Sequence, residues 1–203
     1  GKIIVTMGYK VQPSDEVKYN GSLIKSEKKK YLVLNKPKGF ITSITDKKAK
    51  KTVEELVGNA CRERLYPVGS MDRTTTGVLL FTNDVDLAKK MAHPKNGAVQ
   101  IISVVLDKPL QKTHLTAIAK GLELDDGKID VEEIKYIDER TKREVGLRLH
   151  SGKHRIVNRI FDKLGYTIEK MDRVSFAGFT KKNLSRGQWR FLDPKEIDFL
   201  KTR

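Results

Sequence analysis

A single acidic residue in a hydroxyl-rich loop is the feature of this sequence best suited to chemistry. Asp72 stands between Gly69 and Gly77 and is followed by three threonines, and the apolar run 78–81 predicts a strand directly after the loop. An Asn-Asp pair beyond that strand can cap the next helix. Loops held at both ends by regular structure often carry catalytic groups, although an Asp in a turn more often accepts backbone hydrogen bonds.

The charge balance indicates an anionic partner. The chain has 203 residues, with 41 Lys and Arg against 26 acidic residues and a net charge of +15. Such an excess favours a polyanion such as nucleic acid, or an anionic membrane surface, and a merely basic surface is the plainer alternative. The length suits one medium domain, or one domain with a small appendage.

Other function classes find little support in the composition. No apolar run is long enough to span a bilayer, and the first residues lack the pattern of a secretory signal, so we expect a cytoplasmic protein. Cys61 is the only cysteine, and the four histidines show no ligand spacing. We therefore expect no metal.

Periodicity and turn residues outline an α+β chain in two parts. The charged run 25–30 is the predicted boundary between residues 1–26, with short strands at 2–6 and 16–19, and residues 27–203. The run 99–106 is almost continuously apolar and predicts a central strand buried on both faces. The other predicted strands are 31–35, 78–81, 129–137, 145–150 and 166–178, and the predicted helices are 52–57, 85–91, 113–120, 156–164 and 194–200.

The Asp72 stretch resembles a known family. Residues 66–84 are similar to the Gly-Arg-Leu-Asp loop, continuing into Thr-Gly-Leu-Leu-Leu-Leu-Thr-Asn-Asp, of the bacterial ribosomal-RNA pseudouridine synthases of the small-subunit and related large-subunit branch. Asp72 matches the essential catalytic Asp of that family. Ser70 and Met71 stand where the family has Arg and Leu.

Further landmarks follow in the family's order. Residues 35–39 resemble its Asn-Lys-Pro-x-Gly motif, whose lysines here, Lys36 and Lys38, suit phosphate contact. Residues 184–190 resemble its Leu-x-x-Gly-x-[Trp/Tyr]-Arg phrase. Arg173 falls on the last basic position of the strand that lies next to the family's active site.

The stretch 149–161 resembles the family's Gly-[Lys/Arg]-x-Arg-Gln-[Val/Ile]-Arg-Arg-Met phrase. Arg155 and Arg159 are one helical turn apart, beside Lys153 and a helix N-terminus, and they form a predicted phosphate-binding edge. Asn158 replaces one Arg of the phrase. Ile102 takes the place of a family Tyr that lies against the target uracil.

The resemblance implies an α+β pseudouridine synthase fold, with a mixed, mostly antiparallel sheet and flanking helices. It implies isomerisation of a uridine in ribosomal RNA without a cofactor, by a protein that we expect to be a monomer. Residues 1–26 resemble the closing hairpin of an S4-type RNA-binding domain, so we expect an S4 remnant there. The implied site consists of catalytic Asp72 and substrate-binding Lys36, Lys38, Arg73, Ile102, Lys153, Arg155, Arg159 and Arg173.

Two alternatives remain open at this point. The departures at Ser70, Ile102 and Asn158 fit a family member that has lost chemistry and binds ribosomal RNA through its basic residues. A general basic nucleic-acid binder without a uridine pocket is the third interpretation. The sequence also leaves open which of Arg73, Arg155 or Arg159 pairs with Asp72.

Overall fold

The computed structural model describes residues 3–12, 14–24, 27–42, 51–93, 97–125, 127–150 and 155–202. Its helices are α1 (Val53–Val57), α2 (Val85–Met91), α3 (Lys112–Ala119), α4 (Ile156–Lys163) and α5 (Pro194–Lys201). Its strands are β1 (Lys18–Tyr19), β2 (Ser22–Leu23), β3 (Tyr31–Lys36), β4 (Tyr66–Pro67), β5 (Thr76–Thr82), β6 (Val99–Leu106), β7 (Glu123–Leu124), β8 (Gly127–Lys128), β9 (Glu133–Tyr136), β10 (Glu144–His150), β11 (Ile168–Phe176), β12 (Phe179–Thr180) and β13 (Trp189–Phe191).

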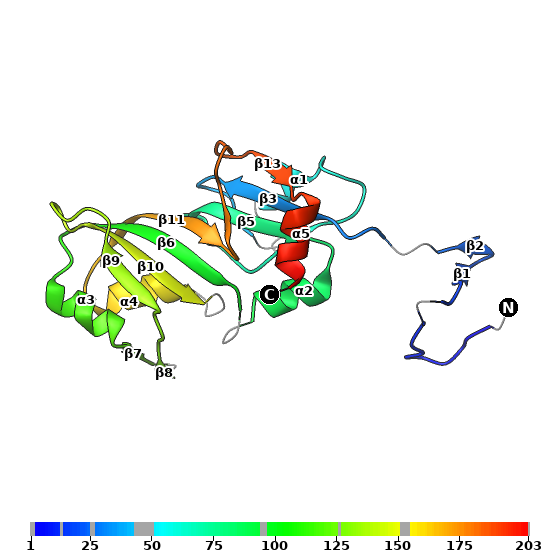
Figure 1. The fold of residues 1–203 in the computed structure, drawn as a ribbon, viewed down its shortest axis with the longest axis horizontal. Helices are drawn as coiled ribbons and strands as arrows, with labels where there is room; N and C mark the ends of the chain where they lie inside the picture. Colours follow the sequence, from blue (N-terminus) through cyan, green and yellow to red (C-terminus); the bar gives the residue numbers. More distant parts are fainter. Residues whose placement is uncertain are drawn as a thin grey trace.

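One large sheet organises the molecule (Figure 1). Its strand order is β13-β3-β5-β11-β6-β10-β9, with β12 paired to β11 and β4 paired to β5. The pairing of β5 with β11 is parallel, and the other pairings within this sheet are antiparallel. The predicted mixed, mostly antiparallel α+β fold is confirmed.

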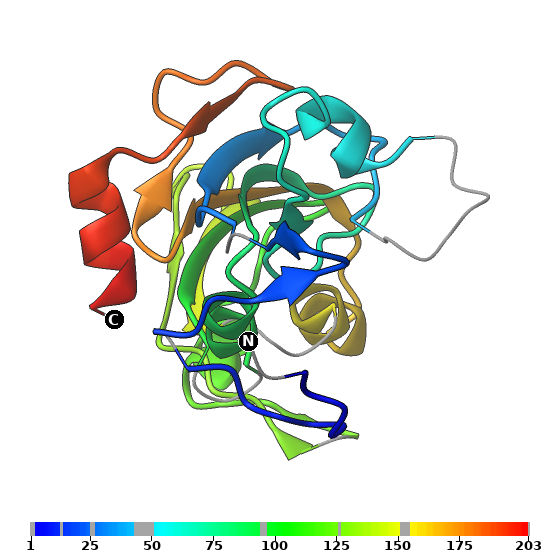
Figure 2. The ribbon, with the colours of Figure 1, turned by 90° about the vertical axis from the view of Figure 1, so that its right-hand side faces the viewer.

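The β3/β5 half of the sheet, formed by β13, β3, β5 and β4, is covered on both faces. Side chains of β3 and β5 pack alternately against α1 on one face and against α2 and α5 on the other. Figure 2 shows β3 lying between α1 and α5. All six residues of β3 are buried as a result. This half is therefore a rigid three-layer block.

The β6/β11 half, formed by β11, β12, β6, β10 and β9, carries α3 and α4 on one face, where its main core lies. Along the middle of β6 and β10 no described helix covers the other face, and Ile101 and its cross-strand neighbour Arg148 are exposed there. At the end of this half, Phe176 of β11 and Phe179 of β12 pack with α2 and α5. The prediction that 99–106 is buried on both faces is therefore wrong: β6 has the predicted bounds, but its exposure alternates. The valines and the isoleucine on its outward face have β-branched side chains, which are common on the pleated surface of half-exposed strands.

The N-terminal segment lies apart from the sheet in Figure 1, and nearly all of its described residues are exposed. The predicted strand 2–6 is absent from residues 3–6, and the strands found here are the two-residue β1 and β2. Their turn, Asn20-Gly21, has positive φ at both residues, as a tight hairpin requires.

Candidate active site

The Asp72 loop lies between β4 and β5 and is held by its own threonines. Oδ1 of Asp72 accepts the amides of Thr74 (3.0 Å) and Thr75 (2.7 Å) and also their hydroxyls, at 2.8 and 2.7 Å. The Thr42 hydroxyl bridges the amide and carbonyl of Met71, each at 3.1 Å. Every hydrogen bond to the carboxylate that the described residues form thus reaches Oδ1, which leaves Oδ2 for a ligand.

These contacts decide the charge of Asp72. Partial burial raises the pKa of the carboxyl group, but the hydrogen bonds from Thr75 and Thr74 outweigh it and hold the pKa below its usual value. Asp72 is therefore ionised at neutral pH. Among the ion pairs that join described residues, none involves Asp72.

Lys36 lies beneath this loop. Its side chain is fully buried, and Nζ donates to the carbonyls of Thr75 (2.7 Å), Asp72 (2.9 Å) and Pro37 (3.3 Å). Burial lowers the pKa of Lys36 to about 8, opposed by the charge of Asp72 and reinforced by that of Arg173. The prediction that Lys36 contacts phosphate is corrected: the ammonium spans the base of the loop because three carbonyls converge there.

Gly77 allows a second buried cation, Arg173, to lie close to Lys36. It is paired with Lys36 of β3 on one side and with Arg173 of β11 on the other. A Cβ at Gly77 would lie 2.2 Å from the Arg173 carbonyl oxygen, and its φ of +107° also favours glycine. The absence of a side chain here allows β11 to approach β5 directly under the Asp72 loop.

Arg173 is almost fully buried, with 4% of its surface exposed. Nε donates to the Val78 carbonyl (2.7 Å), Nη1 makes a long contact to Gln100 Oε1 (3.5 Å), and the buried Nη2 has no partner among the described residues. Burial lowers the pKa of Arg173 to about 9, so the group stays charged at neutral pH. An unpaired buried donor of this kind is suited to an incoming acceptor.

A cleft of about 710 Å³ opens over these groups. Its walls come from the Asp72 loop, β6, β11 and the first turn of α4. Arg73, Arg155 and Arg173 outnumber Asp72 among its lining residues, and Lys36 is buried beneath the loop, so the cleft carries an excess positive charge. The lining residues are Ile41, Thr42, Ser70, Met71, Asp72, Arg73, Thr74, Thr75, Gln100, Ile102, Arg155, Ile156, Val157, Asn158, Met171 and Arg173.

The cleft unites most of the predicted site. Asp72, Arg73, Ile102, Arg155 and Arg173 all line it. Arg155 is exposed and adopts a left-handed conformation (φ 48°) as the N-cap residue of α4. The three residues that depart from the family pattern, Ser70, Ile102 and Asn158, also line this cleft.

Other predicted residues lie elsewhere. Lys38 is exposed outside the cleft lining, on a turn whose Gly39 amide donates to the Arg73 carbonyl at 2.8 Å. Arg159 is half-buried on α4, also outside the lining. Lys153 falls outside the described residues. The phosphate edge predicted along α4 is thus represented in the cleft by Arg155.

Sequence reasoning missed two features of the site. Gln100, which is 7% exposed, lines the cleft beside Arg173, and the signal was its spacing of two residues from Ile102, which places both side chains on one face of β6. Thr75 holds the carboxylate, and here too a signal was present, because Thr and Ser directly after an Asp commonly bond to it.

The described residues offer neither a metal site nor a membrane-spanning helix. No group of three or more His, Cys, Asp or Glu side chains in this part of the chain could hold a metal ion. No helix in the same residues has the length and apolar character needed to cross a membrane.

Comparison with known proteins identifies the family and supports the fold. Residues 30–163 match the model of the family described as RNA pseudouridylate synthase. The chain belongs to the RNA pseudouridine synthase family. The matched region contains the Asp72 loop, β6 and α4, and ends before Arg173.

Individual relatives of this pseudouridine synthase cover most of the chain. The ribosomal large subunit pseudouridine synthase B of Bacillus subtilis is 31% identical over 99% of this chain and 83% of its own length. The enzyme of the same name from Buchnera aphidicola is 32% identical over 84% of this chain and 70% of its own. A crystal structure of a pseudouridylate synthase superposes with a TM-score of 0.77 at 24% identity, covering 98% of this chain and 86% of that one, which supports the fold.

Proposed function

We propose that this pseudouridine synthase converts a uridine of ribosomal RNA to pseudouridine, with Asp72 as its catalytic carboxylate. The observation that carries the proposal is an ionised Asp72 held by one oxygen in a positively charged cleft. Relatives named for the large ribosomal subunit favour large-subunit RNA as the substrate. We expect a monomer that works without a cofactor.

The proposed reaction uses each wall of the cleft. Asp72 starts cleavage of the bond between uracil N1 and the ribose C1′; the uracil turns, its C5 bonds to C1′, and the C5 proton leaves. Extruding the base from its stack costs a few kcal/mol, which phosphate contacts through Arg73 and Arg155 would offset. Ile102 provides an apolar surface for the base in place of a tyrosine ring, and Arg173 Nη2 offers a donor to a uracil carbonyl.

The division of the chain is also part of the proposal. We assign residues 1–26 to an S4-like hairpin and residues 27–203 to the catalytic domain. The exposure of residues 3–12 and 14–24, and their position apart from the sheet, support a separate unit.

A family member without activity is the second candidate, raised by the sequence at Ser70, Ile102 and Asn158, and neither the cleft nor the comparisons favour it. The two are separated by tritium release from large-subunit rRNA transcribed with uridine labelled at C5. We expect release by the wild-type chain and none by Asp72→Asn. Salt-sensitive binding of the transcript without release by the wild type would support the second candidate.

A further inference from the structure

The two halves of the large sheet meet at a narrow junction beneath the cleft. Between β5 and β11 the ladder has two residue pairs, Thr76 with Asp172 and Gly77 with Arg173. The pairings of β3 with β5 and of β6 with β10 have six and seven. The Asp72 loop extends from β5, whereas Arg173 belongs to β11, so this junction sets the distance between the two sides of the site.

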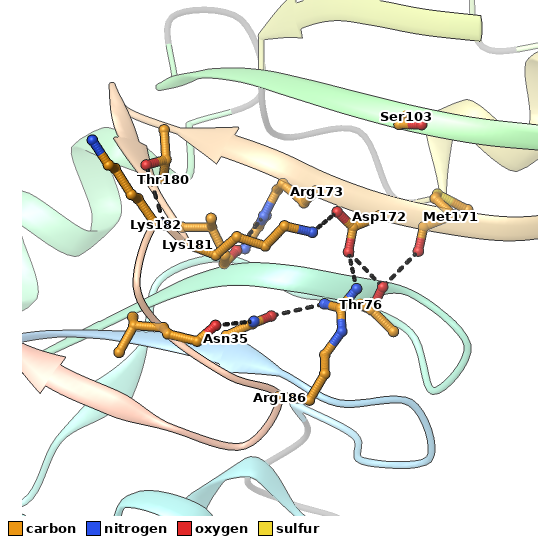
Figure 3. A network of polar contacts seen from close by, with 12 residues as sticks. Asn35, Thr76, Ser103, Met171, Asp172, Arg173, Thr180, Lys181, Lys182 and Arg186 are labelled. Atoms are coloured by element: carbon orange, nitrogen blue, oxygen red, sulfur yellow. Dashed lines mark hydrogen bonds and ion pairs between the residues drawn. The ribbon is translucent and has the colours of Figure 1, made fainter. Parts of the chain in front are cut away.

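A polar cluster crosses the junction on the face opposite the cleft. Side chains alternate along each strand, so Lys36, Thr75 and Arg173 lie on the cleft side of the sheet, while their neighbours Asn35, Thr76 and Asp172 point the other way. Figure 3 shows Asn35, Thr76, Asp172, Lys181 and Arg186 in contact there. The active-site side of three strands is thus backed by a second polar layer.

Arg186 is the cation of the cluster that joins the halves. Nη1 donates to Asn35 Oδ1 on β3, and Nη2 donates to Asp172 Oδ1 on β11, each at 2.7 Å. The loop that carries Arg186 is fixed to β3, because Asn35 Nδ2 donates to the Leu184 carbonyl (2.7 Å) and the Gly187 amide donates to the Asn35 carbonyl (2.8 Å). The planar guanidinium fork suits two acceptors at once.

Lys181 contacts the same carboxylate without crossing the junction. It follows β12, which pairs with β11, and its Nζ binds Asp172 Oδ2. Thr76 adds one more link across the junction, donating from β5 to Asp172 Oδ1 (2.7 Å). The cluster therefore contains one cation that bridges the halves and one that lies within a single half, both on one carboxylate.

We propose that Arg186 is a positioning residue: by joining Asn35 to Asp172 it fixes the β3/β5 half against the β6/β11 half and so holds the Asp72 loop at its working distance from Arg173. It touches neither the cleft nor the substrate. The measurement of rRNA turnover rests on the proposed function, whereas the measurement of the Lys36 pKa does not.

The test compares Arg186→Gln with Lys181→Gln, which removes the same charge from the same carboxylate within one half. Turnover of large-subunit rRNA at saturation should fall about 10-fold or more in Arg186→Gln with KM nearly unchanged, because small misplacements of reacting groups cost rate rather than affinity. Lys181→Gln should retain most of the turnover. Equal losses in the two variants would mean that the charge balance of Asp172 matters and the bridge does not.

The second measurement follows the pKa of Lys36 by NMR of lysine labelled at Cε and Nζ, in the folded protein. Opening of the junction should admit water and raise that pKa from about 8 toward its ordinary value in Arg186→Gln. It should stay unchanged in Lys181→Gln, and simple loss of stability would not move it. An unchanged Lys36 pKa in Arg186→Gln would overturn the proposal, even if the wild type proved inactive on rRNA.

Discussion

The two halves of the sheet differ in how they are covered, and the difference matches what each contributes to the cleft. The β3/β5 half is packed on both faces and carries the loop with Asp72, the proposed catalytic carboxylate. The β6/β11 half is packed on one face along the middle of β6 and β10, and it contributes Gln100, Ile102, Met171 and Arg173 to the cleft. A doubly covered block resists displacement, whereas a strand packed on one side can change its residues with less cost to the core.

The departures from the family pattern fit this division in part. Ile102 lies on β6 and Asn158 on α4, both in the β6/β11 half, while Ser70 lies on the Asp72 loop itself. The comparison therefore makes a prediction for each region. The cost in free energy of unfolding should be largest for Lys36 under the Asp72 loop, smaller for Gly77 at the junction, and smallest for Arg173, which the β6/β11 half contributes to the cleft.

The largest effect is expected for Lys36→Met. It removes the buried ammonium and leaves three carbonyls without their donor, so the free energy of unfolding should fall by about 3 kcal/mol. Lys38→Met is the matched control, since this exposed neighbour should cost within about 0.5 kcal/mol. Urea unfolding measures both. Similar costs for the two variants would contradict the role of Lys36 as the support of the loop.

At the junction, Gly77→Ala should be the more damaging of two glycine substitutions at similar φ. Its Cβ would meet the Arg173 backbone, with the oxygen at 2.2 Å, and we expect a loss of about 2 kcal/mol or more. Gly127, with φ +102°, has no atom within 4 Å of the added Cβ, so Gly127→Ala should cost only the conformational strain of about 1 kcal/mol. Thermal or urea unfolding gives the stability loss of each variant, and the difference between the two measures the cost of the close approach of β5 and β11. Equal losses would show that β11 shifts away from the new Cβ at no cost.

The regular elements of both halves could be predicted because their signals are local. The bounds 85–91 for α2 and 99–106 for β6 follow from the apolar pattern and from Asp84, whose carboxylate accepts the Leu87 amide. Asp72 was found because its loop resembles a family motif. The site residues that the sequence reveals are those whose neighbours in sequence are also their neighbours in space.

The rest depended on contacts that a linear pattern does not carry. Lys36 stands before Pro37 in what reads as an exposed basic turn, and only the return of residues 72–75 over it makes it a buried group. Arg186 lies 151 positions from Asn35 and 14 positions from Asp172 in the sequence, yet it binds both side chains. The exposed face of β6 was missed because β-branched residues occupy both faces of that strand and conceal its alternation.

The smallest effect on stability among the buried groups of the site is expected on the β11 side of the junction, for Arg173→Met. The substitution removes a buried charge whose Nη2 is unpaired, and this relief offsets the lost hydrogen bond from Nε to the Val78 carbonyl, so the free energy of unfolding should change by no more than about 1 kcal/mol. Turnover of large-subunit rRNA should nevertheless fall about 100-fold, because a preorganised donor in the cleft is lost. Arg148→Met, on the open face of the same half, should alter neither quantity appreciably. If Arg173→Met lost as much stability as Lys36→Met, the two sides of the cleft would be equally structural, and the division between a supporting half and a binding half would fail.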